Sequence, residues 1–379
     1  MKYFFLIAAF NALFFALLIL QKKKALHDKI LIAWLTYLGF YIGIFAIFSN
    51  TLFVNFHLLS AAFISLLLLH GPFLYLYISA LINAKTRFGR KKLLHFVPIL
   101  IFNLFLLISP LFPEISEGIR LDHPGGGHHT PLLFNLFLFI TVLSGPAYIL
   151  LAIRLFRKLD LVIFNNFSKS ENISLDWLRK LVYTFGIVWT ILMVFTTVHH
   201  AFELFSWTFC TNGLFFALSL FVILIGYYGL RQKELFIQYP DLQTGSVTES
   251  RKKYAGILLN EDDLERYATK IKEYLSLEKP YLDADLTLPV LAEKLEMPPH
   301  LVSRVINEKF GRHFFDFINQ YRVEEVKSKM ASSGYNHLSL LGIAFESGFN
   351  TKSAFNRVFK KMTSQTPGEF KRQLIKKKS

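Results

Sequence analysis

Histidine is the residue type in this chain best suited to metal binding or to proton exchange near neutral pH. Six of the twelve histidines stand out: five lie in or next to two polar segments between long apolar runs, and one lies inside an apolar run. They are His123, His128 and His129 beside three glycines, His199 and His200 with Glu203, and His70 before Gly71-Pro72. The clusters could bind Zn²⁺ or respond to pH, or they are exposed loop residues and hydrogen-bonded groups at a helix end. His70 could contact a ligand or hydrogen-bond a neighbouring helix.

No other residue pattern predicts catalysis. The apolar runs lack paired aspartates and the H-E-x-x-H and G-x-S-x-G motifs. The one cysteine, Cys210, lies in an apolar run, which predicts a buried, inert thiol. A single cysteine also excludes a disulfide framework, a cysteine zinc site and a redox pair within the chain. We therefore expect no enzyme, no resident metal and no cofactor.

Long apolar runs dominate the first 230 residues. The chain has 379 residues, of which 53% are hydrophobic and 41 are Phe. Helical runs of about 18–25 residues can cross roughly 30 Å of hydrocarbon. Seven are predicted, at Tyr3–Leu20, Ile30–Phe48, Ala61–Leu81, Leu93–Phe112, Leu132–Phe156, Leu181–Phe202 and Phe209–Leu230. Residues 1–230 are thus expected to form a seven-helix transmembrane bundle, which places His70 at membrane depth.

The charges of the loops predict an orientation. The loops after spans 1, 3, 5 and 7 are basic, as in QKKKALHDK and NAKTRFGRKK. The alternate loops SNTLFVNFHLLS, PEISEGIRLDHPGGGHHTP and ELFSW hold one Arg and no Lys. Basic loops stay on the cytoplasmic side, so the N-terminus is expected outside and the residues after span 7 inside.

Residues 231–285 are predicted to form a polar linker with one amphipathic helix at about 262–278. Its apolar positions recur at steps of three and four residues, at Leu264, Tyr267, Ala268, Ile271, Tyr274 and Leu275. Two interpretations stay open: the helix packs on the segment that follows, or it couples the two halves or forms a homodimer.

Residues 286–379 contain the pattern of two helix-turn-helix units. In the first, Thr287 can cap a helix, a turn follows at Glu296–Pro298, and a second helix begins. In the second, Gly348 makes the turn and Asn350 is the expected cap. The inward-facing positions are Leu288, Leu291, Ala292, Leu295, Val302, Val305 and Ile306, then Leu340, Ile343, Ala344, Phe355, Val358 and Phe359. One long helix, HFFDFINQYRVEEVKSKM, connects the units, and the capping box from Thr366 to Glu369 opens a last helix. The whole chain is predicted to be all-α.

This C-terminal segment resembles the AraC/XylS family of bacterial transcription regulators. The matching pieces are AEKLEMPPHLVSRVINEKFG, FINQYRVEEVK and IAFESGFNTKSAFNRVFKKMTSQTPGEFKR. They cover about 90 residues, and the last is long enough to have few accidental occurrences. With a multi-span N-terminal half, the layout is similar to a membrane-anchored subgroup of the family, which implies a bacterial inner (cytoplasmic) membrane.

The resemblance implies that each unit places one recognition helix in a major groove, the two grooves lying about one helical turn apart. Carried over by position, the DNA-binding residues are Pro299, His300, Ser303, Arg304 and Asn307 in the first reader. In the second they are Thr351, Lys352, Ser353, Asn356 and Arg357, with Lys360 and Lys361 near phosphates. Arg can read guanine, Asn can read adenine, and Lys can hold phosphate. Pro298-Pro299 stand where the family favours a Ser or similar cap, so the first unit is expected to read fewer bases.

The features together favour a membrane-anchored transcription regulator. Its partners would be double-stranded DNA, the lipid bilayer, an unidentified signal ligand and, in one alternative, a second copy of the chain. The transmembrane half would be the sensor. The competing hypothesis is a membrane transporter or receptor whose C-terminal module binds a protein instead of DNA.

Overall fold

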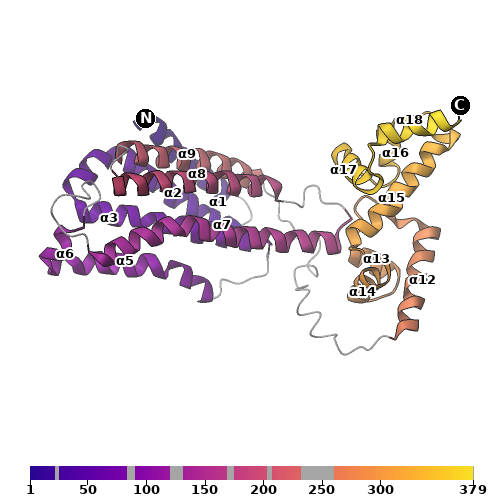
Figure 1. The fold of residues 1–379 in the computed structure, drawn as a ribbon, viewed down its shortest axis with the longest axis horizontal. Coiled ribbons are helices and arrows are strands. Elements are labelled where there is room, and N and C mark those ends of the chain that lie inside the picture. The colour runs from indigo at the N-terminus through magenta and orange to yellow at the C-terminus, as the bar shows by residue number, and fades with distance from the viewer. Residues whose placement is uncertain are drawn as a thin grey trace. The chain divides into compact units, whose positions relative to one another are not determined.

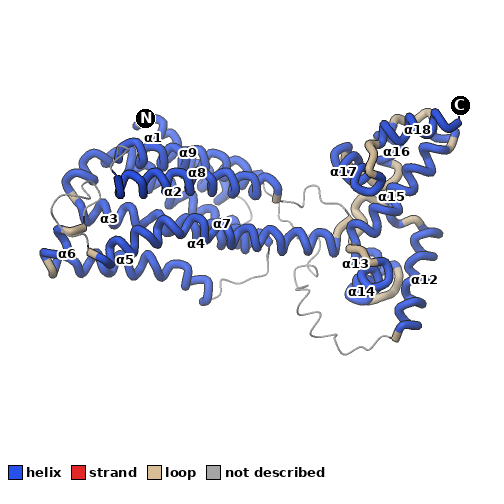
Figure 2. The backbone as a smooth tube through the Cα atoms, in the orientation of Figure 1, coloured by secondary structure: helices blue, strands red, loops and turns tan. Residues whose placement is uncertain are grey.

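A computed structural model describes residues 1–21, 25–82, 90–119, 131–168, 175–202, 207–231 and 260–378. Within these ranges every element is a helix, apart from one isolated antiparallel bridge between Phe167 and Thr287 (Figures 1 and 2). The predicted all-α fold is therefore confirmed. The chain divides into two units, Met1–Phe156 with Leu175–Ile237, and Arg157–Ser174 with Gln238–Ser379. Most of the predicted linker, residues 232–259, lies outside the described ranges.

The first unit is built from helices, most of which are long and apolar. They are α1 (Lys2–Leu20), α2 (Leu26–Asn55), α3 (His57–Ser65), α4 (His70–Ile82), α5 (Val97–Ile108), α6 (Pro113–Glu117), α7 (Leu132–Asn166), α8 (Asp176–Phe202) and α9 (Trp207–Arg231). A short 3₁₀ turn, Leu66–Leu69, joins α3 to α4. Among the described residues, seven helical stretches are long and apolar enough to cross a membrane. They coincide with the seven predicted runs, and α7 extends to Asn166, ten residues past the predicted end of span 5.

Small residues let α1 and α2 approach closely. The buried face of α1 carries Ala8, Ala12 and Ala16, a small residue every fourth position. A Cβ added to Gly39 of α2 would lie 2.8 Å from Leu13 Cγ and 3.2 Å from the Ala9 carbonyl oxygen. In lipid, helix association depends on such close packing because the apolar side chains gain little by leaving the hydrocarbon.

The second unit contains nine described segments of helix. After the end of α7 they are α12 (Glu261–Glu278), a 3₁₀ turn at Pro280–Leu282, α13 (Leu288–Lys294), α14 (Pro299–Phe310), α15 (Phe314–Ala331), a 3₁₀ turn at Ser333–Tyr335, α16 (Leu340–Phe345), α17 (Lys352–Thr363) and α18 (Pro367–Lys378). Two hydrophobic cores hold them together, one for each helix-turn-helix unit. The long helix α15 contributes side chains to both cores, so it is the shared wall of the two units.

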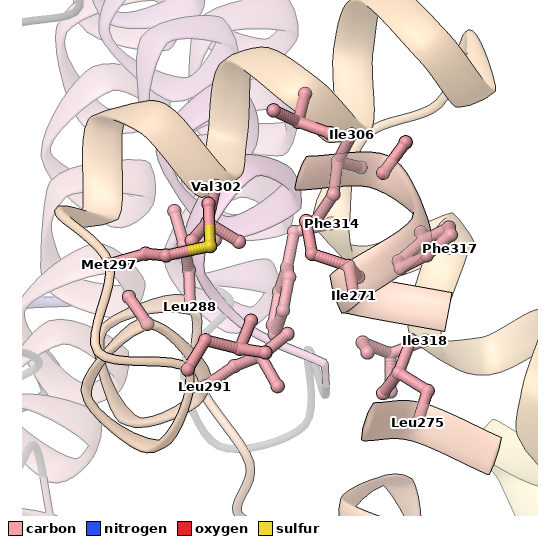
Figure 3. Packing of buried hydrophobic residues seen from close by; sticks show 14 of the residues in the cluster. Ile271, Leu275, Leu288, Leu291, Met297, Val302, Ile306, Phe314, Phe317 and Ile318 are labelled. Carbon is pink, nitrogen blue, oxygen red and sulfur yellow. The ribbon is translucent and has the colours of Figure 1, made fainter. Parts of the chain in front are cut away.

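The first core includes the linker helix. Leu264, Ala268, Ile271 and Leu275 of α12 are buried in one cluster with α13, α14 and the start of α15. Figure 3 shows side chains of this cluster, among them Ile271, Val302 and Phe314, converging from different helices. Asn260 caps α12 by accepting a hydrogen bond from the Asp263 amide at 2.7 Å. Of the two interpretations of this helix, the structure supports packing on the segment that follows.

The close contact between α1 and α2 can be tested by enlarging Gly39. Gly39→Leu is expected to destabilise the first unit by about 1–3 kcal/mol, because the new side chain meets Leu13 and the α1 backbone. Thermal unfolding in detergent, followed by tryptophan fluorescence, would measure the loss. Phe40→Leu is the control, since Phe40 is 60% exposed and the change should stay within about 0.5 kcal/mol. An equally stable Gly39→Leu protein would contradict the packing.

Candidate nucleic-acid interface

Helix α14 presents the first group of predicted reading residues on its outer side. Val302, Val305 and Ile306 are buried against the first core. The other side carries Pro299 and Asn307, which are exposed, and His300, Ser303 and Arg304, which are half-buried. The helix begins at Pro299, where a missing N–H costs nothing because the first turn has no partner for it. The predicted faces of this helix are therefore present.

Two of these side chains are held by their own helix. Arg304 Nε donates to Glu308 at 2.9 Å, an ion pair one turn apart. Asn307 Nδ2 donates to Ser303 Oγ at 3.5 Å. A carboxylate next to Arg304 repels phosphate and competes with a base for the guanidinium, which weakens this helix as a reader.

Helix α17 is the more polar reader. Its inner side is buried: Phe355, Val358 and Phe359 belong to the second core, and Ala354 is buried beside them. Its outer side carries exposed polar and basic residues, namely Lys352, Ser353, Asn356, Arg357, Lys360 and Lys361. An apolar face and a basic face on one short helix suit an element that is anchored on one side and meets an anion on the other.

The cap of α17 differs from the prediction. Asn350 was expected at this position, but Thr351 is the N-cap, and its Oγ1 accepts from the Ala354 amide at 3.1 Å. Thr351 and Asn350 are neighbours with equally suitable side chains, so the sequence pattern could not separate them. The consequence is that Thr351 is half-buried and already bonded, which reduces its availability for a base.

Lys361 points to a different environment from its neighbour Lys360. Its Nζ forms a short ion pair with Asp316 of α15 and lies 6.0 Å from the centroid of the Phe164 ring. Lys361 therefore links α17 to α15 and to the end of α7, in addition to any role toward phosphate.

The first helix of each helix-turn-helix unit, α13 or α16, is fixed at its C-terminal end by a lysine from another helix. Lys270 of α12 donates to the Leu295 carbonyl oxygen at 2.8 Å, and Lys329 of α15 donates to the Glu346 carbonyl oxygen at 2.6 Å. Leu295 and Glu346 are the C-cap residues of α13 and α16. A cation at this place satisfies a free carbonyl and the negative end of the helix dipole. Sequence analysis missed both lysines because their partners lie far along the chain.

A buried arginine joins the two helix-turn-helix units. Arg322 of α15 is 2% exposed. Its Nε donates to the Tyr281 carbonyl at 2.8 Å, Nη1 to the Ser168 carbonyl at 2.9 Å and Asn319 Oδ1 at 3.4 Å, and Nη2 to Ser168 Oγ at 2.9 Å and the Asp283 carbonyl at 2.8 Å. Five acceptors thus surround its five N–H groups. Sequence analysis missed this residue, although a charge one turn from Ile318 and from Val326 on a buried helix face was the available signal.

An ion pair beside this arginine fixes the segment between α12 and α13, which precedes the first helix-turn-helix unit. Burial acts against the ionised form of Glu325, but the hydrogen bond and charge of Lys279, with the charge of Lys329 and the Tyr281 hydroxyl, hold the pKa of Glu325 below its usual value. Lys279 Nζ lies 3.1 Å from Glu325 Oε2, and Lys279 itself has a positive φ of 46° at the end of α12. The contribution of this pair to stability is present above the unfolded pKa of Glu325 and is lost as the pH falls through the folded value.

The structure describes only some of the residues predicted to take part in sensing. His70 is 5% exposed, and its Nε2 lies 3.5 Å from the Tyr37 hydroxyl. It lines an apolar pocket in the first unit together with Trp34, Tyr148 and Trp189. The predicted sites His128, His129 and Glu203 lie outside the described ranges, and the side chains of His199 and His200 are not described. No group of three metal-binding side chains occurs in the part of the chain that the structure describes.

The turn of the second helix-turn-helix unit, between α16 and α17, depends on a glycine. Gly348 has φ +89°, and a Cβ there would lie 2.2 Å from the Tyr281 carbonyl and 2.9 Å from Arg322 Nε. We expect Gly348→Ala to destabilise the second helix-turn-helix unit by more than about 2 kcal/mol. The new methyl group adds left-handed backbone strain and displaces the hydrogen bond between the buried Arg322 and the Tyr281 carbonyl. Hydrogen exchange of α15 in the full-length protein would measure this.

Two further glycines separate the causes of that effect. Gly311→Ala tests the backbone alone, since its φ is +63° with nothing within 4 Å, and should cost about 1 kcal/mol. Gly368→Ala tests neither, since nothing lies within 4 Å and its φ is not positive, and should change stability by less than about 0.5 kcal/mol. Equal effects at all three positions would contradict the proposed contact.

Comparison with known proteins agrees with this geometry. Residues 291–373 match the family described as Helix-turn-helix domain. An uncharacterized HTH-type transcriptional regulator of Staphylococcus aureus (strain COL) is 28% identical over 114 residues, which is 30% of this chain and 14% of the relative. The HTH-type transcriptional regulator YtdP of Bacillus subtilis (strain 168) is 28% identical over 91 residues, 24% of this chain and 11% of the relative. The chain thus matches only 14% and 11% of the length of these two relatives, and no solved structure matches it. The C-terminal part of the chain is a helix-turn-helix domain of the AraC type.

Proposed function

We propose that this protein is a membrane-anchored, sequence-specific DNA-binding regulator of transcription. The two helix-turn-helix units would read successive major grooves, and the transmembrane half would act as the sensor. The observation that carries the proposal is the outer face of α17, where basic and amide side chains line one side of a helix whose other side is buried. The names of the relatives, which are HTH-type transcriptional regulators, support the same function.

The residues of α17 have distinct expected roles. Asn356 and Arg357 are neighbours in the second turn of the helix and could reach base edges, since Asn pairs with adenine and Arg with guanine. Lys352 at the first turn and Lys360 at the last turn would hold phosphates and set the register. On α14 the residues proposed to approach DNA are Pro299, His300, Ser303, Arg304 and Asn307.

The seven apolar helices support anchoring in the membrane. A module that reads chromosomal DNA must lie in the cytoplasm, and the basic loops after spans 1, 3, 5 and 7 favour the same side. We therefore propose a multi-pass protein of the bacterial inner membrane with its N-terminus outside. Reporter fusions at Met1 and at Ser379 test this: alkaline phosphatase should be active only at the N-terminus, and active phosphatase at the C-terminus would contradict the topology.

The pocket around His70 is the part of the first unit best suited to a signal ligand. Its walls are apolar, yet the indole N–H groups of Trp34 and Trp189 are buried and have no hydrogen-bond acceptor among the residues that the structure describes. A buried donor without an acceptor favours a ligand that supplies one. A small apolar molecule with a carbonyl or hydroxyl oxygen would fit these walls, and it would reach the pocket from the bilayer or from outside.

A receptor or transporter with a protein-binding C-terminal module is the second candidate. The apolar bundle and its pocket are compatible with it. It accounts less well for the basic outer face of α17, because protein interfaces are depleted in lysine at their centre. Capture of DNA fragments from cells that express the full-length protein separates the two, since a protein-binding module would enrich no sequence.

Replacing Arg357 tests the reading role. Arg357→Ala in the full-length protein is expected to weaken binding to the captured DNA by about 1–3 kcal/mol and to relax the preference at one base position. Lys360→Ala should instead weaken binding to all sequences equally and reduce the salt dependence by about one phosphate contact. Titrations at two salt concentrations would measure both.

Arg266→Ala on α12 is the control for these substitutions. This arginine is exposed and pairs only one turn away with Asp263, so its loss should leave affinity unchanged. An equal loss for Arg357→Ala on captured and random DNA would make Arg357 a phosphate contact and would contradict its role in reading bases.

A further inference from the structure

The end of α7 is built into the helix-turn-helix domain. Residues 132–156 of this helix belong to the first unit, whereas residues 157–174 belong to the second. Ile163, Phe167 and Ser168 are at most 2% exposed. Nothing in the sequence of this segment, which follows an apolar span and resembles a cytoplasmic loop, predicts that it belongs to a DNA-binding domain.

The polar attachment of this segment is centred on Ser168. Its Oγ donates to the Leu286 carbonyl at 2.6 Å and its amide donates to the same oxygen at 3.3 Å. Its carbonyl accepts from Asn319 Nδ2 and from Arg322 Nη1, both at 2.9 Å. Its Oγ also accepts from Arg322 Nη2 at 2.9 Å. One serine therefore satisfies acceptor and donor groups on both sides of the junction between the two helix-turn-helix units.

The apolar attachment lies one turn earlier. The Phe164 ring packs edge-on against Phe315 of α15, with centroids 5.2 Å apart. Phe164 also belongs to the margin of the second core and lies under Lys361 of α17. Phe167 forms an antiparallel bridge with Thr287, the N-cap residue of α13. The same short segment thus contacts the start of the first helix-turn-helix unit, the connecting helix α15 and helix α17.

Without this segment, Arg322 would lose part of its set of hydrogen-bond acceptors. Two of the five acceptors around its guanidinium belong to Ser168. A buried cation with unsatisfied N–H groups is unstable, so α15 either rearranges or opens when Ser168 leaves. Since α15 is the shared wall of both cores, its rearrangement changes the position of α14 relative to α17.

We propose that residues 163–168 are a docking element that holds the two helix-turn-helix units at a fixed spacing, and that the transmembrane half controls DNA reading through it. Docking is the state competent to bind two successive grooves. Helix α7 runs without a break from Leu132 to Asn166, so it joins the apolar part of the chain directly to this element. The control of DNA reading rests on the proposed function, but the docking itself does not.

Hydrogen exchange of the full-length protein in detergent tests the docking. Ser168→Leu removes the hydroxyl and adds bulk, so exchange in residues 286–288 and 314–331 should rise at least about tenfold, with α1 and α2 unchanged. Ser168→Thr keeps the hydroxyl and should stay close to the wild type. Leu161→Ala, seven residues earlier on α7, is the matched control, because Leu161 is 53% exposed. Unchanged exchange in Ser168→Leu would overturn the proposal.

A reversible cross-link provides a second measurement of the docking, independent of the substitutions at Ser168. Phe167→Cys with Thr287→Cys, in a Cys210→Ser background, places two thiols across the antiparallel bridge. Oxidation should form the disulfide rapidly in the full-length protein. Failure to cross-link, when the reduced protein exchanges like the wild type, would also overturn the docking.

DNA binding by the same proteins tests the control. Duplexes selected from random sequence by the wild type should bind the oxidised pair as tightly as the wild type, and should bind Ser168→Leu at least about tenfold more weakly. Raised exchange with unchanged affinity would refute the control of reading. Wild-type protein that docks but selects no DNA would refute the proposed function while the docking stands.

Discussion

The hydrogen bonds that surround Arg322, called the cage below, are the interaction on which the whole C-terminal domain depends. A guanidinium can be buried only if its N–H groups find acceptors, because the loss of hydration is otherwise far larger than any packing gain. Here the acceptors come from Tyr281, Asp283, Asn319 and Ser168. These residues lie before the first helix-turn-helix unit, within the connecting helix and at the end of α7. One side chain therefore requires three distant pieces of chain to be in place together.

The turn between α16 and α17, in the second helix-turn-helix unit, is part of the same constraint. Gly348 must have no side chain because the Tyr281 carbonyl and the Arg322 guanidinium occupy the space beside it. The positive φ of this residue aims the chain into α17, so the geometry of the reader is set by the residue that also permits the cage. Lys270 and Lys329 complete the arrangement by holding the C-terminal ends of α13 and α16. The readers are thus rigid for reasons that lie on the side away from DNA.

Much of this architecture follows from patterns that are local in sequence. Apolar runs predict the long helices of the first unit because length and hydropathy are properties of a single stretch of sequence, and steps of three and four residues predict α12, α14 and α17. The cap at Thr351 instead of Asn350 was missed because two adjacent residues compete for one position. The contacts of Ser168 with Asn319 and Arg322 join residues about 150 positions apart. No periodicity encodes such a pairing, so only the folded chain reveals it.

The two readers are unequal, and this gives the spacing between them its importance. Helix α14 begins with Pro299 and holds Arg304 on Glu308, whereas α17 exposes Asn356, Arg357 and Lys360 together. A weak reader contributes to affinity mainly when the stronger one keeps it at high effective concentration over its own groove. That concentration depends on how rigidly α15 connects the two. A small loosening of α15 therefore removes the contribution of α14 first, which would reduce the recognised site from two grooves to one without unfolding either unit.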